Sequence, residues 1–216
     1  MPDWRGRTVV CIASGPSLTP EDCELVRAAG HPTVVVNTSF RLAPWAEILF
    51  AWDWRWWREY AKEVRDFKGR RFTALPSAER FGAVCIADLP WFPRGFQNSG
   101  ACAVGIAIAA KAEKVLMLGF DCQAKTIDLT DAEVLALYDW SMLAALRAKA
   151  KGDSVKMLHW HGAHPESMSN AASIDQWPTT FEKVAKRAKS QGVRVVNVSR
   201  ETALTCFPRA ALEEQL

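Results

Sequence analysis

The stretch "TVVCIASGPSLTPED", residues 8–22, indicates the type of fold. It starts as an apolar run rich in β-branched residues, passes through Ser-Gly-Pro-Ser, and becomes acidic after Thr19. The apolar run predicts a buried strand over residues 8–13. Thr19, followed by a proline and two acidic residues, predicts a helix over residues 20–29 that ends at Gly30. The stretch therefore reads as strand, turn and helix, without the glycine spacing of a dinucleotide-binding turn or a P-loop.

The same alternation of strand and helix signals continues along the chain. Further strands are expected at residues 33–36, 48–52, 71–74, 83–87, 115–118 and 193–198, and helices at 54–67, 131–149 and 174–190. A long apolar helix between two of these strands is expected to begin with Ser99 as its N-cap. Residues 122–172 lack strand character. The order predicts an α/β fold: one domain over residues 1–216 with a doubly wound, mostly parallel Rossmann-like sheet and a helical lid insertion at about 122–172.

Composition excludes several classes of protein. The 216 residues include 27 Lys and Arg against 24 Asp and Glu, so that the net charge of +3 is too balanced to favour nucleic-acid binding by bulk charge. The six cysteines form no C-x-x-C pair, which favours free thiols in a reducing compartment. The first residues do not resemble a signal peptide, and the longest apolar stretch, 101–110, is too short to span a membrane. A cytoplasmic location is expected.

Small or polar residues follow the predicted strands, where ligands of doubly wound sheets bind. The turn after the first strand offers the hydroxyls of Ser14 and Ser17, and its backbone amides near Gly15 are expected to point at a ligand. An ordinary strand-to-helix turn would explain the same residues. Asn37 follows the second strand and would bond a base, a ribose or a sugar, or it closes the strand as an Asx turn.

Three further positions extend this row of candidates. Ser99 and Gly100 open the central helix, where N–H groups and the helix dipole favour an anion, although an ordinary N-cap uses the same residues. Asp121 comes after a later strand, where it would hold a ribose or a substrate hydroxyl or act as a cap. Asp53, after the third strand, is assigned to the substrate.

The polar stretch "HWHGAHPESMSN", residues 159–170, contains His159, His161 and His164. A histidine there is a candidate general base, because its pKa lies near neutrality. A metal site is the alternative, but no cysteine or carboxylate stands at a recognisable ligand spacing, and no metal ligand is assigned. Inert surface histidines also remain open.

Together, "IASGPSL", "NTSF", "NSGACAVGIAIAAKAEKVLMLGFD", "HGAHPESMSN" and "GVRVVNVSRETALTCFP" form an ordered set across residues 8–208. The set resembles the small bacterial sialyltransferases that use CMP-sialic acid, and related phage-encoded glycosyltransferase-like proteins. The resemblance implies a Rossmann-like fold with a lid. It also implies metal-independent transfer from a nucleotide-sugar donor of CMP or UDP type to an acceptor hydroxyl, with no further cofactor required.

The resemblance also implies roles for individual residues. The nucleotide would be bound by Gly15, Pro16, Ser17 and Asn37, and the donor also by Ser99 and Gly100. Ser14 and Asp121 are assigned to the nucleotide from their own positions after strands. His164 would be the general base, with His161 as the alternative, and Asn170 would join Asp53 at the substrate. The family's tyrosines are missing from "GFDCQAKTID", so that Lys125, or an arginine such as Arg209, would neutralise the leaving phosphate.

Two other functions remain open. The first is a phage-type transferase that modifies DNA or nucleotides, in which the tryptophans of "AWDWRWWREY", residues 51–60, stack bases beside Arg55 and Arg58. The second is a non-catalytic nucleotide-binding or assembly protein, with those tryptophans at the interface of a homo-oligomer. A buried aromatic cluster is the simpler explanation of the same tryptophans.

Overall fold

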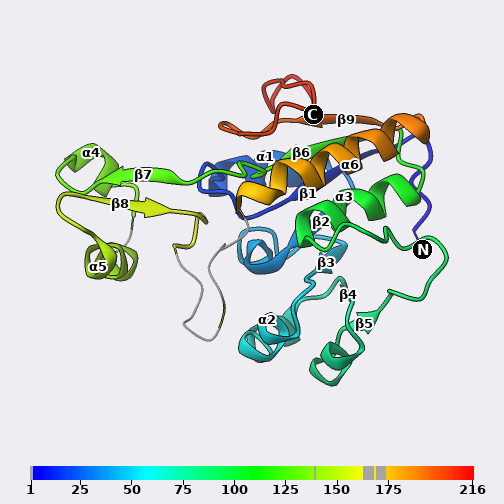
Figure 1. Ribbon diagram of the computed structural model, residues 1–216, viewed down its shortest axis with the longest axis horizontal. Coiled ribbons are helices and arrows are strands. Elements are labelled where there is room, and N and C mark those ends of the chain that lie inside the picture. Colours follow the sequence, from blue (N-terminus) through cyan, green and yellow to red (C-terminus); the bar gives the residue numbers. More distant parts are fainter. Residues whose placement is uncertain (1, 139, 163–167, 169–173) are drawn as a thin grey trace.

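The computed structural model describes residues 2–138, 140–162, 168 and 174–216. In this part of the chain, a seven-stranded parallel sheet has the order β5-β4-β3-β2-β1-β6-β9 (Figure 1). Its strands are β1 (Thr8–Ile12), β2 (Thr33–Val36), β3 (Ile48–Phe50), β4 (Arg70–Thr73), β5 (Val84–Cys85), β6 (Lys114–Leu118) and β9 (Arg194–Asn197). The order reverses between β1 and β6, which is the switch point where doubly wound sheets bind ligands.

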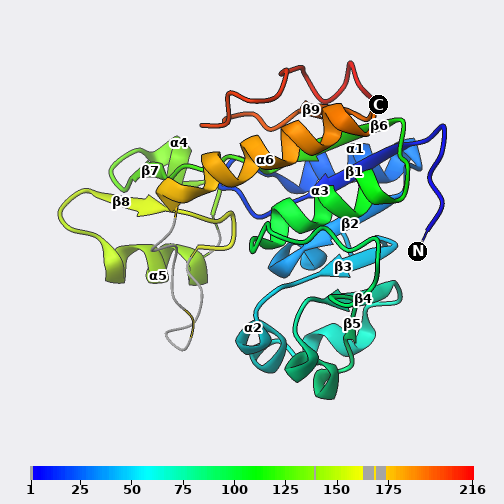
Figure 2. The same cartoon turned by 45° about the vertical axis from the view of Figure 1, so that its right-hand side comes forward.

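Helices cover both faces of this sheet. The α-helices are α1 (Pro20–Ala29), α2 (Trp54–Glu59), α3 (Ser99–Ala109), α4 (Ala132–Leu135), α5 (Trp140–Lys149) and α6 (Trp177–Ser190), and the short 3-10 helices are η1 (Asn37–Arg41), η2 (Glu63–Asp66), η3 (Pro76–Phe81) and η4 (Ile174–Gln176). Figure 2 shows α3 and α6 side by side over one face, and α1 and α2 pack on the opposite face. The doubly wound, Rossmann-like α/β fold is therefore confirmed.

The start of α1 follows from local sequence. Thr19 and Asp22 form a reciprocal capping box, with each side chain accepting the other's backbone N–H at 3.2 Å. Pro20 occupies the first turn, and Gly30 ends the helix with a φ of 69°. These groups satisfy backbone donors and acceptors that a helix leaves open at its ends.

The start of α3 differs from the expectation. Asn98 is the N-cap, because its backbone is extended and its Oδ1 accepts the Ala101 N–H at 2.9 Å. Ser99 is already helical, so that its expected role as N-cap is wrong and its hydroxyl is available for another bond. Residues 100–108 are all buried, in agreement with an apolar helix at the centre of the fold.

The insertion after β6 contains strands that the sequence pattern did not indicate. β7 (Lys125–Asp128) and β8 (Ser154–Met157) form an antiparallel hairpin, with α4 and α5 in the connection between them (Figure 1). Ile127, Val155 and Met157 of the hairpin pack against Leu146 of α5. The insertion has the expected helices, but the expectation that residues 122–172 lack strand character is wrong, because these short, half-exposed strands bury only three side chains against Leu146 of α5 and so give no continuous apolar run.

Two of the four tryptophans in residues 51–60 pack inside the protein. Trp56 and Trp57 are almost completely buried and meet edge to face. Trp54 is half-buried, and the guanidinium carbons of Arg58 and Arg80 lie 5.0 and 5.8 Å from its ring centroid. Trp56 and Trp57 cannot stack bases or form an exposed interface in this arrangement.

In the described part of the chain, no helix is long and apolar enough to cross a membrane.

Candidate functional site

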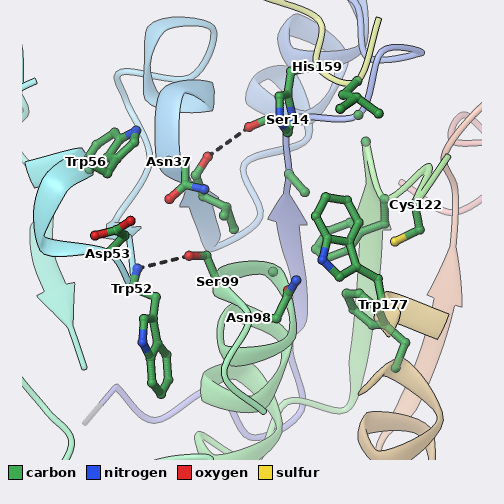
Figure 3. Close-up of a pocket in the computed structure, with 18 of the residues that line it drawn as sticks. Ser14, Asn37, Trp52, Asp53, Trp56, Asn98, Ser99, Cys122, His159 and Trp177 are labelled. Carbon is green, nitrogen blue, oxygen red and sulfur yellow. Dashed lines mark hydrogen bonds between the residues drawn. The ribbon is translucent and has the colours of Figure 1, made fainter. Parts of the chain in front are cut away.

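A cavity of about 390 Å³ lies at the carboxyl edge of the sheet, at the switch point (Figure 3). This volume is in the range of pockets that bind small molecules. Its lining includes six of the predicted site residues, namely Ser14, Gly15, Asn37, Asp53, Ser99 and Gly100. They meet because parallel strands place their carboxyl ends along one edge.

The turn after β1 contributes fewer free donors than its sequence suggested. The Gly15 N–H donates to the Gly119 carbonyl at 2.7 Å, the Ser17 N–H to Asp121 Oδ2 at 2.8 Å, and the Leu18 N–H to the Gly15 carbonyl at 3.1 Å. Pro16 has no N–H to give. The expectation that the amides of this turn point at a ligand is therefore wrong for these residues, because they bond within the protein.

Asp121 lies beneath the cavity rather than in its lining. Its side chain is almost completely buried, and its Oδ1 accepts the Ser17 hydroxyl at 2.9 Å while Oδ2 accepts the Ser17 N–H. Burial raises the pKa of Asp121 to about 6, although the two hydrogen bonds from Ser17 oppose this shift. Asp121 and Ser17 thus connect the end of β6 to the turn after β1, with no atom presented to a ligand in this arrangement.

The raised pKa of Asp121 predicts how stability depends on pH. The folded protein holds this proton up to about pH 6, whereas the unfolded chain releases it near 3.8. Protonation of Asp121 therefore raises the free energy of unfolding as the pH falls from 6 towards 4. The full gain is about 3 kcal/mol, and it is lost above pH 6. Urea unfolding at pH 7.5 and pH 5 should show about 1.4 kcal/mol of this effect, because pH 5 lies one unit below the folded pKa, and Asp121→Asn should lack it. An equal pH dependence in the two proteins would contradict the assignment.

The helix N-terminus that faces the cavity is that of α3, not that of α1. At α1, the buried Asp22 carboxylate already caps the helix and accepts two bonds from Arg200, at 2.7 and 3.1 Å. At α3, the first N–H groups belong to Ser99 and Gly100, both of which line the cavity. These amides have no carbonyl partner within the helix and carry its positive dipole end. An anion in the cavity would be stabilised there.

Two residues at the start of α3 are held in place. The Ser99 hydroxyl accepts the Trp52 N–H at 3.0 Å, which joins α3 to the end of β3 (Figure 3). Gly100 packs against Phe120, since a Cβ at this position would lie only 2.9 Å from the Phe120 ring. Both contacts fix the first turn of α3 against the strands beside it.

Asn37 and Asp53 form the opposite wall. Asn37 begins η1 with a φ of 51°, a left-handed conformation that asparagine tolerates better than most residues. Asp53 caps α2, and its Oδ1 accepts the Arg55 N–H at 2.8 Å. Asn37 therefore offers an amide, and Asp53 a second carboxylate oxygen, to a bound molecule.

The loop after β8 covers the cavity. The Trp160 N–H donates to the Ser14 carbonyl at 3.1 Å, and its indole N–H donates to the Ser39 hydroxyl at 3.3 Å. Ser39 in turn bonds the Ala13 carbonyl and the Ser14 hydroxyl, at 2.8 and 3.0 Å. Trp160 thereby attaches the lid to the turn after β1 and brings His159 to the cavity.

Two of the three histidines of residues 159–170 lie in the described part of the chain. Of the histidines that the structure describes, His159 lines the cavity, and its ring stacks on that of His161 with a centroid distance of 5.2 Å. His161 faces a second cavity within the lid. His164 and Asn170 lie outside the described residues. Neither Lys125 nor Arg209 lines the first cavity. Lys125 begins β7, and Arg209 donates to the Ser199 and Arg200 carbonyls.

Several lining residues were not assigned a site role of their own from the sequence. They are His159, Asn98, Trp52, Cys122 and Trp177, the last of which stands beside Cys122 in Figure 3. The His-x-His spacing was the available signal for His159.

All six cysteines are free thiols. Among the described residues, no group of three or more His, Cys, Asp or Glu side chains is placed to hold a metal ion.

Comparisons with known proteins identify no family for this chain. No family model matches it, and none of the curated proteins matches it significantly. Among solved structures, the chain is similar to UDP-glucose 4-epimerase from Brucella ovis in complex with NAD, with 9% identity and a TM-score of 0.33. The match covers 90% of this chain and 51% of the epimerase, so that the chain spans about half the length of that enzyme. The fold class is therefore established by the order and direction of the strands rather than by any relative.

Proposed function

We propose that the cavity binds the nucleotide part of an activated sugar donor, and that the protein transfers the sugar or a similar group to an acceptor hydroxyl. The observation that carries this proposal is the convergence at the switch point of the first amides of α3, two polar side chains at the ends of β2 and β3, and a lid histidine. These groups match the three parts of such a reaction: a phosphate, a nucleoside and a hydroxyl proton.

The walls of the cavity suggest how the donor lies. The donor phosphate faces the Ser99 and Gly100 amides, where the helix dipole favours negative charge. The nucleoside extends towards Asn37, which bonds the base, and Asp53, which accepts ribose hydroxyls. Among the described lining residues there is no lysine or arginine. A donor with a single phosphate charge, of the CMP type, suits this wall better than a diphosphate.

Transfer then needs one proton acceptor. The acceptor oxygen bonds to the sugar carbon while the bond from that carbon to the phosphate oxygen breaks, and the phosphate leaves with the bonding electrons. The developing phosphate charge faces the amides of α3, and His159 takes the proton of the acceptor hydroxyl. We assign the base to His159 because it lines the cavity, whereas His161 faces the second cavity.

A thermal-shift panel of CMP, CDP, UMP and UDP, with and without EDTA, tests this function. At a concentration near 100 times Kd, the binding nucleotide should raise Tm by about 5 °C or more, because such occupancy adds about 2.7 kcal/mol. CMP should give the largest shift, and EDTA should leave it unchanged.

The matched variants use two amide side chains. Asn37→Ala should remove most of the shift, because Asn37 lines the cavity. Gln191→Ala should keep it, because Gln191 follows α6 at the opposite edge of the sheet. The proposal fails if no nucleotide raises Tm, or if the shift in Asn37→Ala equals that of the unchanged protein.

A further inference from the structure

A second cavity, of about 310 Å³, lies within the lid between α5 and β8. Its helical wall consists of Met142, Ala145, Leu146 and Lys149, which recur at the three- and four-residue spacing of one helix face. On the other side, Val155 and Met157 of β8 supply buried apolar side chains. Most of the lining is therefore apolar, and its two lysines are Lys149 at one end of the helical wall and Lys156 on β8.

The two cavities share the loop that follows β8. Leu158 lines both of them, while His159 lines the first and His161 lines the second. The two imidazole rings are stacked with an interplanar angle of 5°. A molecule in the lid cavity would therefore end at the histidine pair, next to the site where the donor is proposed to react.

The length and polarity of the lid cavity can be estimated from α5. Gly162 follows His161 and lies against Met142, because a Cβ built on Gly162 would be 2.9 Å from the Met142 sulfur. Met142 therefore marks the end of the cavity at which the histidines lie. Lys149 stands seven residues further along the helix, about 10 Å away at the usual rise per residue. Lys149 is exposed, and Lys156 also lines the cavity. Among the described lining residues there is no carboxylate.

We propose that the lid cavity is the acceptor site, and that the acceptor is amphiphilic: an apolar body about 10 Å long with a hydroxyl at one end and an anionic group at the other. The hydroxyl would lie at His159 and His161, and the anionic group at Lys149. The role as acceptor rests on the proposed function of the first cavity, whereas binding of such a molecule does not.

Calorimetric titration with 4-(4-hydroxyphenyl)butanoate tests binding. Two exposed alanines of α5 provide a matched pair of variants, because Ala145 lines the cavity and Ala148 lies outside its lining. Ala145→Trp fills the cavity and should weaken binding at least tenfold, and Ala148→Trp should leave Kd within twofold. Tm and circular dichroism confirm that both variants fold.

A second pair tests the charge. Lys149→Glu should weaken binding of the carboxylate probe about tenfold but change the affinity for the neutral analogue 4-(4-hydroxybutyl)phenol by less than twofold. Lys151→Glu, an exposed lysine outside the lining, should change neither. Equal losses for the charged and neutral probes would show that Lys149 does not hold an anion, and would overturn the proposed class of acceptor.

The outcomes also separate this inference from the proposed function. The inference is wrong if neither probe binds with a Kd below about 1 mM, or if both tryptophan variants bind equally well. If Ala145→Trp no longer binds the probe while no nucleotide raises Tm, the lid site is supported and the proposed transfer reaction is rejected. If nucleotides bind and the probes do not, the donor site stands and the lid site falls.

Discussion

Replacing His159 with asparagine is expected to slow group transfer by a factor of about 10² to 10⁴, the usual contribution of a general base. Asparagine keeps a polar group of similar size beside Trp160 but cannot accept the hydroxyl proton near neutral pH. Nucleotide affinity should stay within about twofold, since the proposed phosphate and nucleoside contacts come from other elements. The thermal-shift panel first identifies the nucleotide that binds. Steady-state kinetics with the corresponding nucleotide sugar then measures the rate, and the Tm shift caused by the nucleotide measures binding.

The other two lid histidines serve as controls for His159. His161→Asn should change kcat less, because His161 lies behind His159 and faces the lid cavity. Full turnover in His159→Asn, together with an inactive His164→Asn, would move the base to His164.

Replacing Gly15 with alanine is expected to destabilise the protein by about 3 kcal/mol or more, among the larger effects of single substitutions. The new Cβ would lie 2.1 Å from Asp121 Oδ1 and 2.5 Å from the Gly119 carbonyl oxygen. Neither atom can move easily, because Ser17 holds the Asp121 carboxylate with two bonds and Gly15 itself bonds the Gly119 carbonyl. Urea unfolding at pH 7.5 measures the change.

Gly30→Ala is the matched control for this substitution. Gly30 has a φ of 69°, and no atom lies within 4 Å of a Cβ built there, so that only the left-handed backbone costs energy, about 1 kcal/mol. A loss in Gly15→Ala no greater than in Gly30→Ala would show that the contact with Asp121 is not rigid. If Gly15→Ala is too unstable to purify, the two variants are compared by their yield of soluble protein and by their sensitivity to protease.

Local patterns predicted most of the central fold. The capping box of Thr19 and Asp22 was readable because both groups lie within one turn of helix. The strands β1, β2 and β6 were readable because a parallel strand buried on both faces is a continuous apolar run. The hairpin of β7 and β8 was missed because its strands are half exposed and pack against α5, which the sequence pattern alone does not bring near.

Strand-end positions also predicted much of the cavity. Ser14, Asn37 and Asp53 each follow a different parallel strand, and the fold class alone places such residues along one edge. Ser17 and Asp121 follow strands in the same way, yet they bond each other beneath the cavity. Position after a strand therefore identifies the edge of the sheet but not the direction in which each side chain points.

The sequence by itself determined the order of the strands and helices of the central sheet, and hence the edge at which a ligand would bind, because periodicity and caps act over a few neighbouring residues. Only the tertiary structure decided which groups are available there. The Gly15 and Ser17 amides donate to groups that follow β6, whereas the first amides of α3 face the cavity. Trp160 bonds the turn after β1 and so brings His159 to the cavity. The reason is that each donor satisfies the nearest acceptor in space, and that acceptor is often a hundred residues away in the chain.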